Sequence, residues 1–178
     1  GATAFRVRRV RLNHADAALS ATNQALQLLE ELVAQHPDVP DYRLDLALAL
    51  NKSGERLRKT SAFEPADAAL KQAAGLLVQL LAEAPQVPAF QEALAVNWIE
   101  QGQMHEAQHR LDDADAFSQE AAARLQRLVD DYPNLPRYRE QLAASQRSRA
   151  WLLLALDRAS DAEQPFASSL RHWEQLVA

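Results

Sequence analysis

The sequence contains no cysteine and only four glycines among its 178 residues. The lack of cysteine excludes a disulfide framework, a thiol nucleophile and a zinc finger, and it leaves the redox compartment undetermined. The scarcity of glycine argues against a nucleotide-binding fold, and no glycine-rich phosphate loop is present. No apolar run reaches the ~18 residues that a membrane span requires, and no signal peptide is visible.

The chain also lacks an excess of positive charge, because its formal net charge is −5. It therefore has no global attraction for nucleic acid or anionic lipid. A basic cluster does occur at the start, and it consists of Arg6, Arg8, Arg9 and Arg11. Four arginines in an acidic chain are weak evidence for such a partner, so we expect no nucleic acid and no direct membrane insertion.

Alanine and leucine are abundant, with 35 and 28 residues. This composition favours α-helix and argues against a β-sandwich or a barrel. Hydrophobic residues make up 48% and charged residues 24% of the chain, which excludes disorder and allows a sizeable core. We expect an all-α protein.

Six of the eight prolines form three pairs that are 48 residues apart, namely Pro37 with Pro40, Pro85 with Pro88, and Pro133 with Pro136. A fixed spacing of this length indicates an internal structural repeat. Each pair divides two helices, because proline ends one helix and suits the first turn of the next. A second boundary lies inside each unit, at the column Asn13, Ser61, His109 and Asp157. We interpret this column as helix N-caps, with Ser61 and Glu64 forming a capping box.

These signals predict a solenoid of antiparallel helix pairs, coiled as a right-handed superhelix of about 7–8 helices. The expected helices cover roughly 3–12, 15–36, 40–60, 64–84, 88–108, 112–132, 136–156 and 160–177, with ends uncertain by about 2–4 residues. Pro165 falls past the first turn of the last helix, which is therefore expected to start late or to kink. The array is predicted to form one domain over 1–178, with a half unit at 1–36 and units at about 37–84, 85–132 and 133–178.

Several repeated positions resemble the tetratricopeptide repeat (TPR). The columns of small residues are Gly54, Gly102 and Ala150, and Ala18, Ala66, Ala114 and Ala162. The segment HPDVPDYRLDLALALN is similar to the long-unit TPR arrays of planctomycete bacteria, which often follow a serine/threonine kinase domain. The unit departs from the usual 34 residues, and His105 and Ser118 occupy columns that are normally large and apolar. The resemblance implies a non-catalytic scaffold that binds a protein or peptide, as a segment of a larger bacterial signalling or assembly protein.

In TPR proteins the first helix of each unit lines a concave groove, and the resemblance places three sets of residues there. These are Asn51, Glu55 and Arg58, then Ile99, Gln103 and Glu106, then Arg147, Trp151 and Leu154. The partner-binding candidates are Asn51, Glu55, Arg58, Arg147 and Trp151. Trp151 differs from Trp98 and Trp173, which are expected to pack in the core, because its counterparts are the polar Glu55 and Gln103. A tryptophan at a polar position either reaches solvent or anchors a partner.

One catalytic pattern competes with this interpretation. His105-Glu106-Ala107-Gln108-His109 spells H-E-x-x-H, which is typical of a zinc-dependent hydrolase when both histidines share one helix face. The repeat places His109 in the turn column and His105 in the inward column of Leu57 and Leu153, so the two imidazoles are not expected on one straight helix. We therefore expect no catalytic residue, no metal and no cofactor.

A further alternative is self-assembly through the end helices. The last helix carries Leu170, Trp173, Leu176 and Val177, which leave an apolar stripe uncovered and favour a homo-oligomer. The sequence leaves the compartment undetermined; a cytoplasmic location is favoured, with a periplasmic one as the alternative if an upstream segment is missing.

Overall fold

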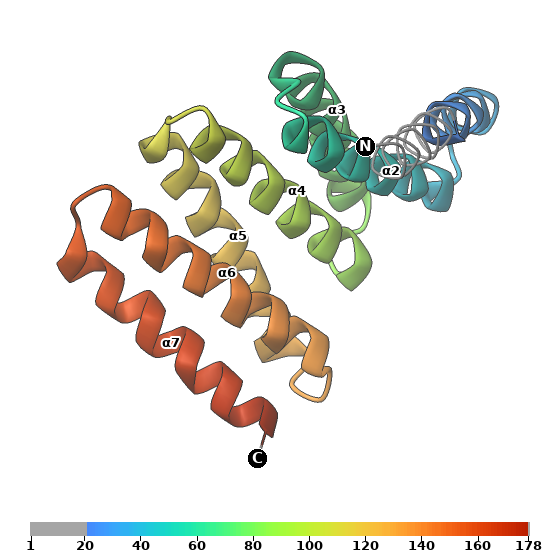
Figure 1. Cartoon of the computed structure of the whole chain (residues 1–178). Helices are drawn as coiled ribbons and strands as arrows, with labels where there is room; N and C mark the ends of the chain where they lie inside the picture. The colour runs from blue at the N-terminus through green and yellow to red at the C-terminus, as the bar shows by residue number, and fades with distance from the viewer. Residues whose placement is uncertain (1–20, 178) are drawn as a thin grey trace, which may run out of the picture.

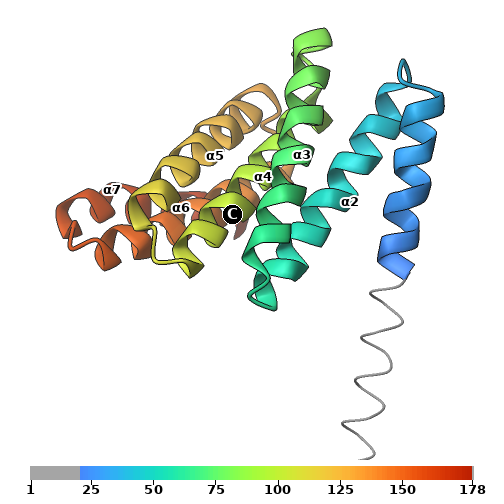
Figure 2. The ribbon, with the colours of Figure 1, turned by 90° about the horizontal axis from the view of Figure 1, so that it is seen from above.

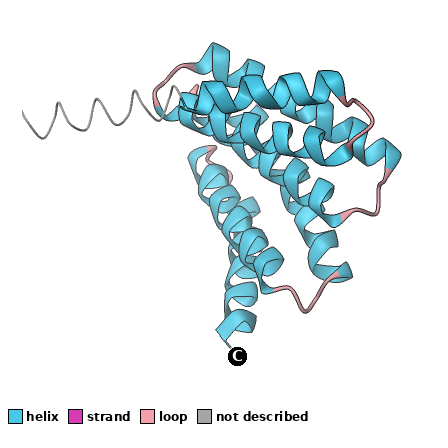
Figure 3. Ribbon diagram, turned by 90° about the vertical axis from the view of Figure 1, so that its right-hand side faces the viewer, coloured by secondary structure: helices cyan, strands magenta, loops and turns pink. Residues whose placement is uncertain are grey.

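The computed structural model describes residues 21–177, and Figures 1 and 3 show them as antiparallel helices joined by short loops. No strand occurs in this range. A helix covers 21–35, followed by α2 (Pro40–Lys59), α3 (Phe63–Glu83), α4 (Pro88–Ala107), α5 (Leu111–Asp131), α6 (Pro136–Ala155) and α7 (Ala159–Val177). The predicted bounds of α2 to α7 are confirmed to within one residue. The helix expected at 3–12, Asn13 and the basic cluster lie outside the described residues.

The hydrophobic core is divided among successive helix junctions rather than gathered at one centre. One cluster joins α2, α3 and α4 around Leu50, Leu77 and Leu94, and the helix at 21–35 packs against it. Further clusters join α4 to α5 and α6, α3 to α4, and α6 to α7. Each helix therefore packs mainly on its neighbours along the chain, as Figures 1 and 2 show. The fold is an all-α solenoid of antiparallel helix pairs.

The proline pairs act as the sequence predicts. Pro40, Pro88 and Pro136 each stand at the start of a helix, where a missing N–H costs nothing. The residues before them have extended backbone, as expected from the clash between proline and the preceding residue.

The second helix boundary of each unit lies where the sequence predicts it, but the residues there do not form the predicted N-caps. Ser61, His109 and Asp157 are not N-caps, because they have φ angles of 59°, 60° and 58° and lie in the left-handed region. The N-cap of α3 is Ala62, which forms no side-chain cap, so the capping box of Ser61 and Glu64 is absent. The column instead closes the preceding helix.

The backbone bonds explain this closure. The N–H of Ala62 donates to Leu57 O and the N–H of Ser61 donates to Arg58 O, both at 2.9 Å. This is the Schellman arrangement, which requires a left-handed residue just after the helix. The same pair of bonds recurs after α4 and α6. Asparagine and aspartate are good N-caps and also tolerate the left-handed region, so a column that contains Asn13 and Asp157 suggested the wrong role.

The last helix does not start late. α7 begins at Ala159 and continues through the buried Pro165. The ring nitrogen of Pro165 cannot donate to the carbonyl of Asp161, and Asp161 is exposed, so the missing bond lies on the solvent side of the helix.

Candidate binding groove on α2, α4 and α6

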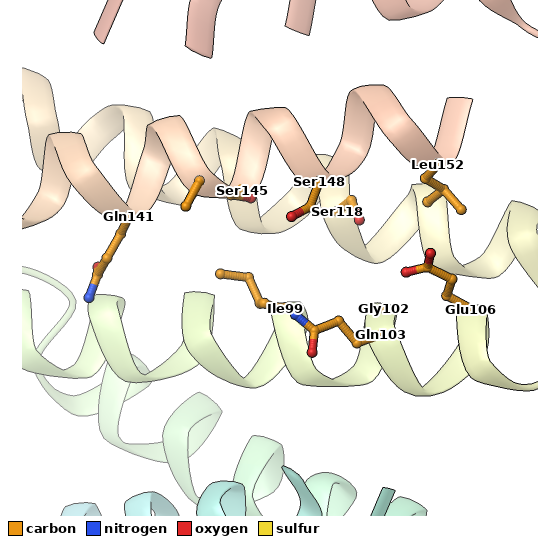
Figure 4. A pocket seen from close by; sticks show the side chains of 10 residues that line it. Ile99, Gly102, Gln103, Glu106, Ser118, Gln141, Ser145, Ser148 and Leu152 are labelled. Atoms are coloured by element: carbon orange, nitrogen blue, oxygen red, sulfur yellow. The ribbon is translucent and has the colours of Figure 1, made fainter. Parts of the chain in front are cut away.

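Two adjoining pockets open where α2, α4 and α6 face the same side of the array. The larger, of about 520 Å³, is lined by Arg58, Gln103, Glu106, Ala107, Ser148 and Trp151. The smaller, of about 200 Å³, is lined by Ile99, Gly102, Gln103, Glu106, Ser118, Gln141, Ala144, Ser145, Ser148 and Leu152. Figure 4 shows the smaller pocket between α4 and α6, with α5 behind it. Because Gln103, Glu106 and Ser148 line both pockets, we call the two together the groove.

Trp151 stands at the rim of the groove and is 62% exposed. Its ring meets the ring of Phe166 on α7 edge-to-face, with 5.4 Å between centroids. The indole is therefore held in place by α7 while one face stays open to solvent. Trp98, in contrast, packs against the core cluster of α2 to α4.

Arg58 and Glu55 both have their charges compensated within the array. The guanidinium of Arg58 donates to Gln103 Oε1 at 2.7 Å and to Glu100 Oε2 at 3.4 Å, which joins α2 to α4. The carboxylate of Glu55 accepts hydrogen bonds from Lys52 and Lys59, each at 2.6 Å. These bonds, that from Lys52 first, lower the pKa of Glu55 to about 2.

Asn51 lies inside the protein and does not line either pocket. It is 4% exposed, its Nδ2 donates to Ala93 O at 3.3 Å, and its Oδ1 accepts from Asn97 Nδ2 at 2.7 Å. Asn97 Nδ2 also donates to Leu70 O at 2.9 Å, and Asn97 Oδ1 accepts from Gln101. This buried amide network ties α2 to α3 and α4.

The structure thus brings two of the five sequence-predicted binding residues, Arg58 and Trp151, into one pocket. Arg147 is exposed on α6 but does not line the groove. The sequence prediction missed the polar residues of the smaller pocket, which are Ser118, Gln141, Ser145 and Ser148. One signal was available, because Ser118 stands in a column with Leu70 and Phe166.

As the repeat register predicts, the two histidines of the H-E-x-x-H pattern do not lie on one helix face. α4 ends at Ala107, and His109 lies in the left-handed turn that follows. His105 is buried and its ring stacks on that of Phe117, with centroids 5.2 Å apart. Between residues 21 and 177, no group of three or more histidines and carboxylates is arranged to hold a metal ion.

None of the helices in the described part of the chain combines the length and the apolar character of a transmembrane helix.

No protein-family model matches the chain, and no curated protein matches it. One solved structure, titled MamA MSR-1 C2, is similar over 89% of this chain and 71% of that chain, with 17% sequence identity and a TM-score of 0.49. We draw no argument from this similarity. The fold assignment rests on the helix pairs, the divided core and the 48-residue period.

Proposed function

We propose that this chain is a non-catalytic helical-repeat scaffold that binds a protein segment or peptide in the groove of α2, α4 and α6. The exposed Trp151 beside an adjoining pair of pockets carries this proposal. Exposed tryptophans next to pockets are typical of the residues that dominate binding energy at interfaces. An exposed aromatic that served only the fold would bury its ring instead.

The groove offers a peptide both polar and apolar contacts. Arg58 is held in place by Gln103 and Glu100, so its guanidinium is already oriented and loses little conformational entropy on binding. Glu106 is exposed and has no ion pair within the described residues. Trp151 supplies a flat surface on which a peptide can lie.

The five residues predicted from the sequence keep different roles in this proposal. Arg58 and Trp151 contact the partner, and Arg147 reaches it from the exposed edge of α6. Glu55 is held by its two lysines beside the groove. Asn51 supports the groove from the interior. The wider context, a segment of a larger bacterial signalling or assembly protein, follows from the resemblance to kinase-associated arrays.

The test is a selection of random peptides displayed on phage against the full chain, followed by calorimetry on the selected peptides. We expect Trp151→Ala to weaken binding by about 30-fold, since residues of this kind contribute about 2 kcal/mol or more at interfaces. Leu170→Ala, on the exposed side of α7, is the matched control and should leave the affinity unchanged. Equal affinities for the Trp151→Ala variant and the unmodified chain would overturn the proposal.

Self-assembly through the end helices stays an alternative prediction. Leu170 is 60% exposed on α7, and an apolar stripe there would pair with an apolar surface on another copy. Light scattering on the unmodified chain and on Leu170→Glu tests it. A monomer at all concentrations, or an oligomer that the substitution leaves intact, would contradict assembly through this stripe.

A further inference from the structure

The repeat makes two helix junctions directly comparable. Residues that differ by 48 in number occupy equivalent positions, so the junction of α2, α3 and α4 corresponds to the junction of α4, α5 and α6. All ten residues that line the smaller pocket belong to the second junction. Their counterparts show how the first junction fills the same space.

Leu70 fills the first junction. Its side chain is fully buried and lies against Gly54, because a Cβ atom at that glycine would stand 2.6 Å from Leu70 Cγ. Asn97, which is 0% exposed, closes the middle with its hydrogen bonds to Asn51 and Leu70. The Arg58–Glu100 pair closes the end.

The second junction carries smaller side chains at four of the same positions. Leu70, Val96, Asn97 and Glu100 are replaced by Ser118, Ala144, Ser145 and Ser148. Gly102 is the counterpart of Gly54, but a Cβ there would meet Ser118 Oγ at 3.4 Å instead of leucine carbons. The pocket of about 200 Å³ lies among these smaller side chains, all four of which line it.

The walls of the pocket suit an aliphatic group. Ile99, Ala144 and Leu152 supply apolar surface from α4 and α6, and Figure 4 shows the side chains of Ile99 and Leu152 on these two helices. For scale, an apolar cavity of about 150 Å³ accommodates benzene, so a cavity of the present size holds a leucine side chain.

A polar group at one end indicates how a peptide backbone would lie. The side chain of Gln141 lines the pocket, and its Nε2 donates to Glu92 Oε1 at 3.0 Å. Its Oε1 is buried and has no hydrogen-bond partner. An unsatisfied buried acceptor costs free energy, which a main-chain N–H from a ligand would recover.

We propose that the pocket between α4 and α6 is a specificity subsite for a leucine-sized aliphatic side chain of the bound peptide. At the second junction the aliphatic side chain of the ligand occupies the space that the side chain of Leu70 occupies at the first junction. Its main-chain N–H donates to Gln141 Oε1. This inference rests on the proposed function, since it specifies which side chain the groove selects.

The sharpest test fills the pocket with the residue of the first junction. Ser118→Leu should raise the melting temperature, because the added side chain buries apolar surface against Gly102. The same variant should bind the phage-selected peptides at least tenfold more weakly. Ser160→Leu makes the same change at an exposed position on α7 that lines neither pocket, and it is the matched control, with affinity unchanged within twofold. If Ser118→Leu does not fold, Ala144→Val serves instead. This variant introduces on α6 the valine that stands at the equivalent position of the first junction.

The anchor is identified by replacing each position of a selected peptide in turn. Alanine at the anchoring leucine should cost at least tenfold in affinity for the unmodified chain and little for Ser118→Leu, because the two changes remove the same contact. A folded Ser118→Leu or Ala144→Val variant that binds with full affinity would overturn the subsite. So would peptides whose anchor is charged or aromatic.

A small probe separates this inference from the proposed function. Isobutanol, which carries the isobutyl group of a leucine side chain, should shift the NMR signals of Ile99 and Leu152 in the unmodified chain and not in Ser118→Leu. If the probe shifts these signals while no peptide is selected, the result supports the pocket and contradicts the proposed peptide binding. If peptides bind through Trp151 but the probe shifts neither residue, the scaffold proposal stands and the subsite fails.

Discussion

His105 is a polar side chain at a repeat position where two other units carry leucine. Its equivalents are Leu57 and Leu153, and like them it points inward. Its Nδ1 is buried without a hydrogen bond, and the nearest carboxylate oxygen, on Asp113, is 4.0 Å away. Burial, and then the positive charge of Arg110, lower the pKa of His105. The folded protein therefore favours the neutral imidazole more strongly than the unfolded chain does.

This gives a prediction for pH. Because the folded pKa lies below the ordinary value near 6.5, the unfolded chain binds more protons as the pH falls below that value. The free energy of unfolding should therefore fall between pH 8 and pH 5.5. His105→Leu should reduce this fall and raise stability at pH 5.5 by about 1 kcal/mol, since it removes an unsatisfied buried polar group.

Urea unfolding at the two pH values measures this effect. His172, whose pKa is also lowered by burial, should leave a residual pH dependence in the variant. His109→Ala is the control, because that side chain is exposed in a turn. If His105→Leu has the same pH dependence as the unmodified chain, the burial argument fails.

The helix ends are the clearest lesson at the scale of elements. The spacing of prolines and polar residues located every boundary of α2 to α7 within one residue. It did not identify the turn type, because the hydrogen bonds of a Schellman turn depend on a backbone angle that the residue type only biases. Serine at Ser61 tolerates this angle poorly, whereas aspartate at Asp157 suits it better.

Two substitutions at one site test this reading of the turn. Ser61→Gly should stabilise the protein by about 0.5–1 kcal/mol, because glycine adopts φ near 60° without strain. Ser61→Val should destabilise it by a similar or larger amount, since a β-branched residue is strained there. Thermal unfolding measures both. Asp157→Gly should gain less than Ser61→Gly, and an equal loss from both changes at Ser61 would contradict a left-handed turn.

At the scale of the whole molecule, stability is carried from helix to helix. α5 packs against both α4 and α6, whereas α7 packs against α6. Asp115 on α5 spans this end, since it pairs with Arg149 on α6 at 2.7 Å and with Arg158, just before α7, at 3.1 Å. Asp115 is buried, so loss of its charge leaves two arginines without their shared partner.

Hydrogen exchange measures how strongly α7 is coupled to the rest of the array. We expect the amides of α7 to exchange faster than those of α5, because local opening needs fewer contacts to be lost. Asp115→Asn should accelerate exchange in α7 further while leaving α3 unchanged. Asp113→Asn, which removes an exposed carboxylate paired with Arg110, is the matched control. Uniform acceleration along the whole chain would indicate one cooperative unit instead of a chain of junctions.

The sequence pointed to some of the residues that line the groove. The resemblance selected the first helix of each unit, and with it Arg58 and Trp151, both of which line the larger pocket; their contact with a partner stays a prediction. It also selected Asn51, which the structure places in a buried network because α2 and α4 are joined there by Asn97. The sequence did not predict the smaller pocket, because no single residue indicates it. It appears only when four side chains on α5 and α6 are compared with their counterparts 48 residues earlier.

The sequence by itself determined the period, the all-α class and the helix bounds. These depend on residues within one or two turns of each other, and proline and the apolar spacing act over that range. Only the tertiary structure decided that one junction is filled and the next is open. That difference depends on side-chain volumes meeting across three helices, where one leucine in place of a serine separates a closed core from a cavity.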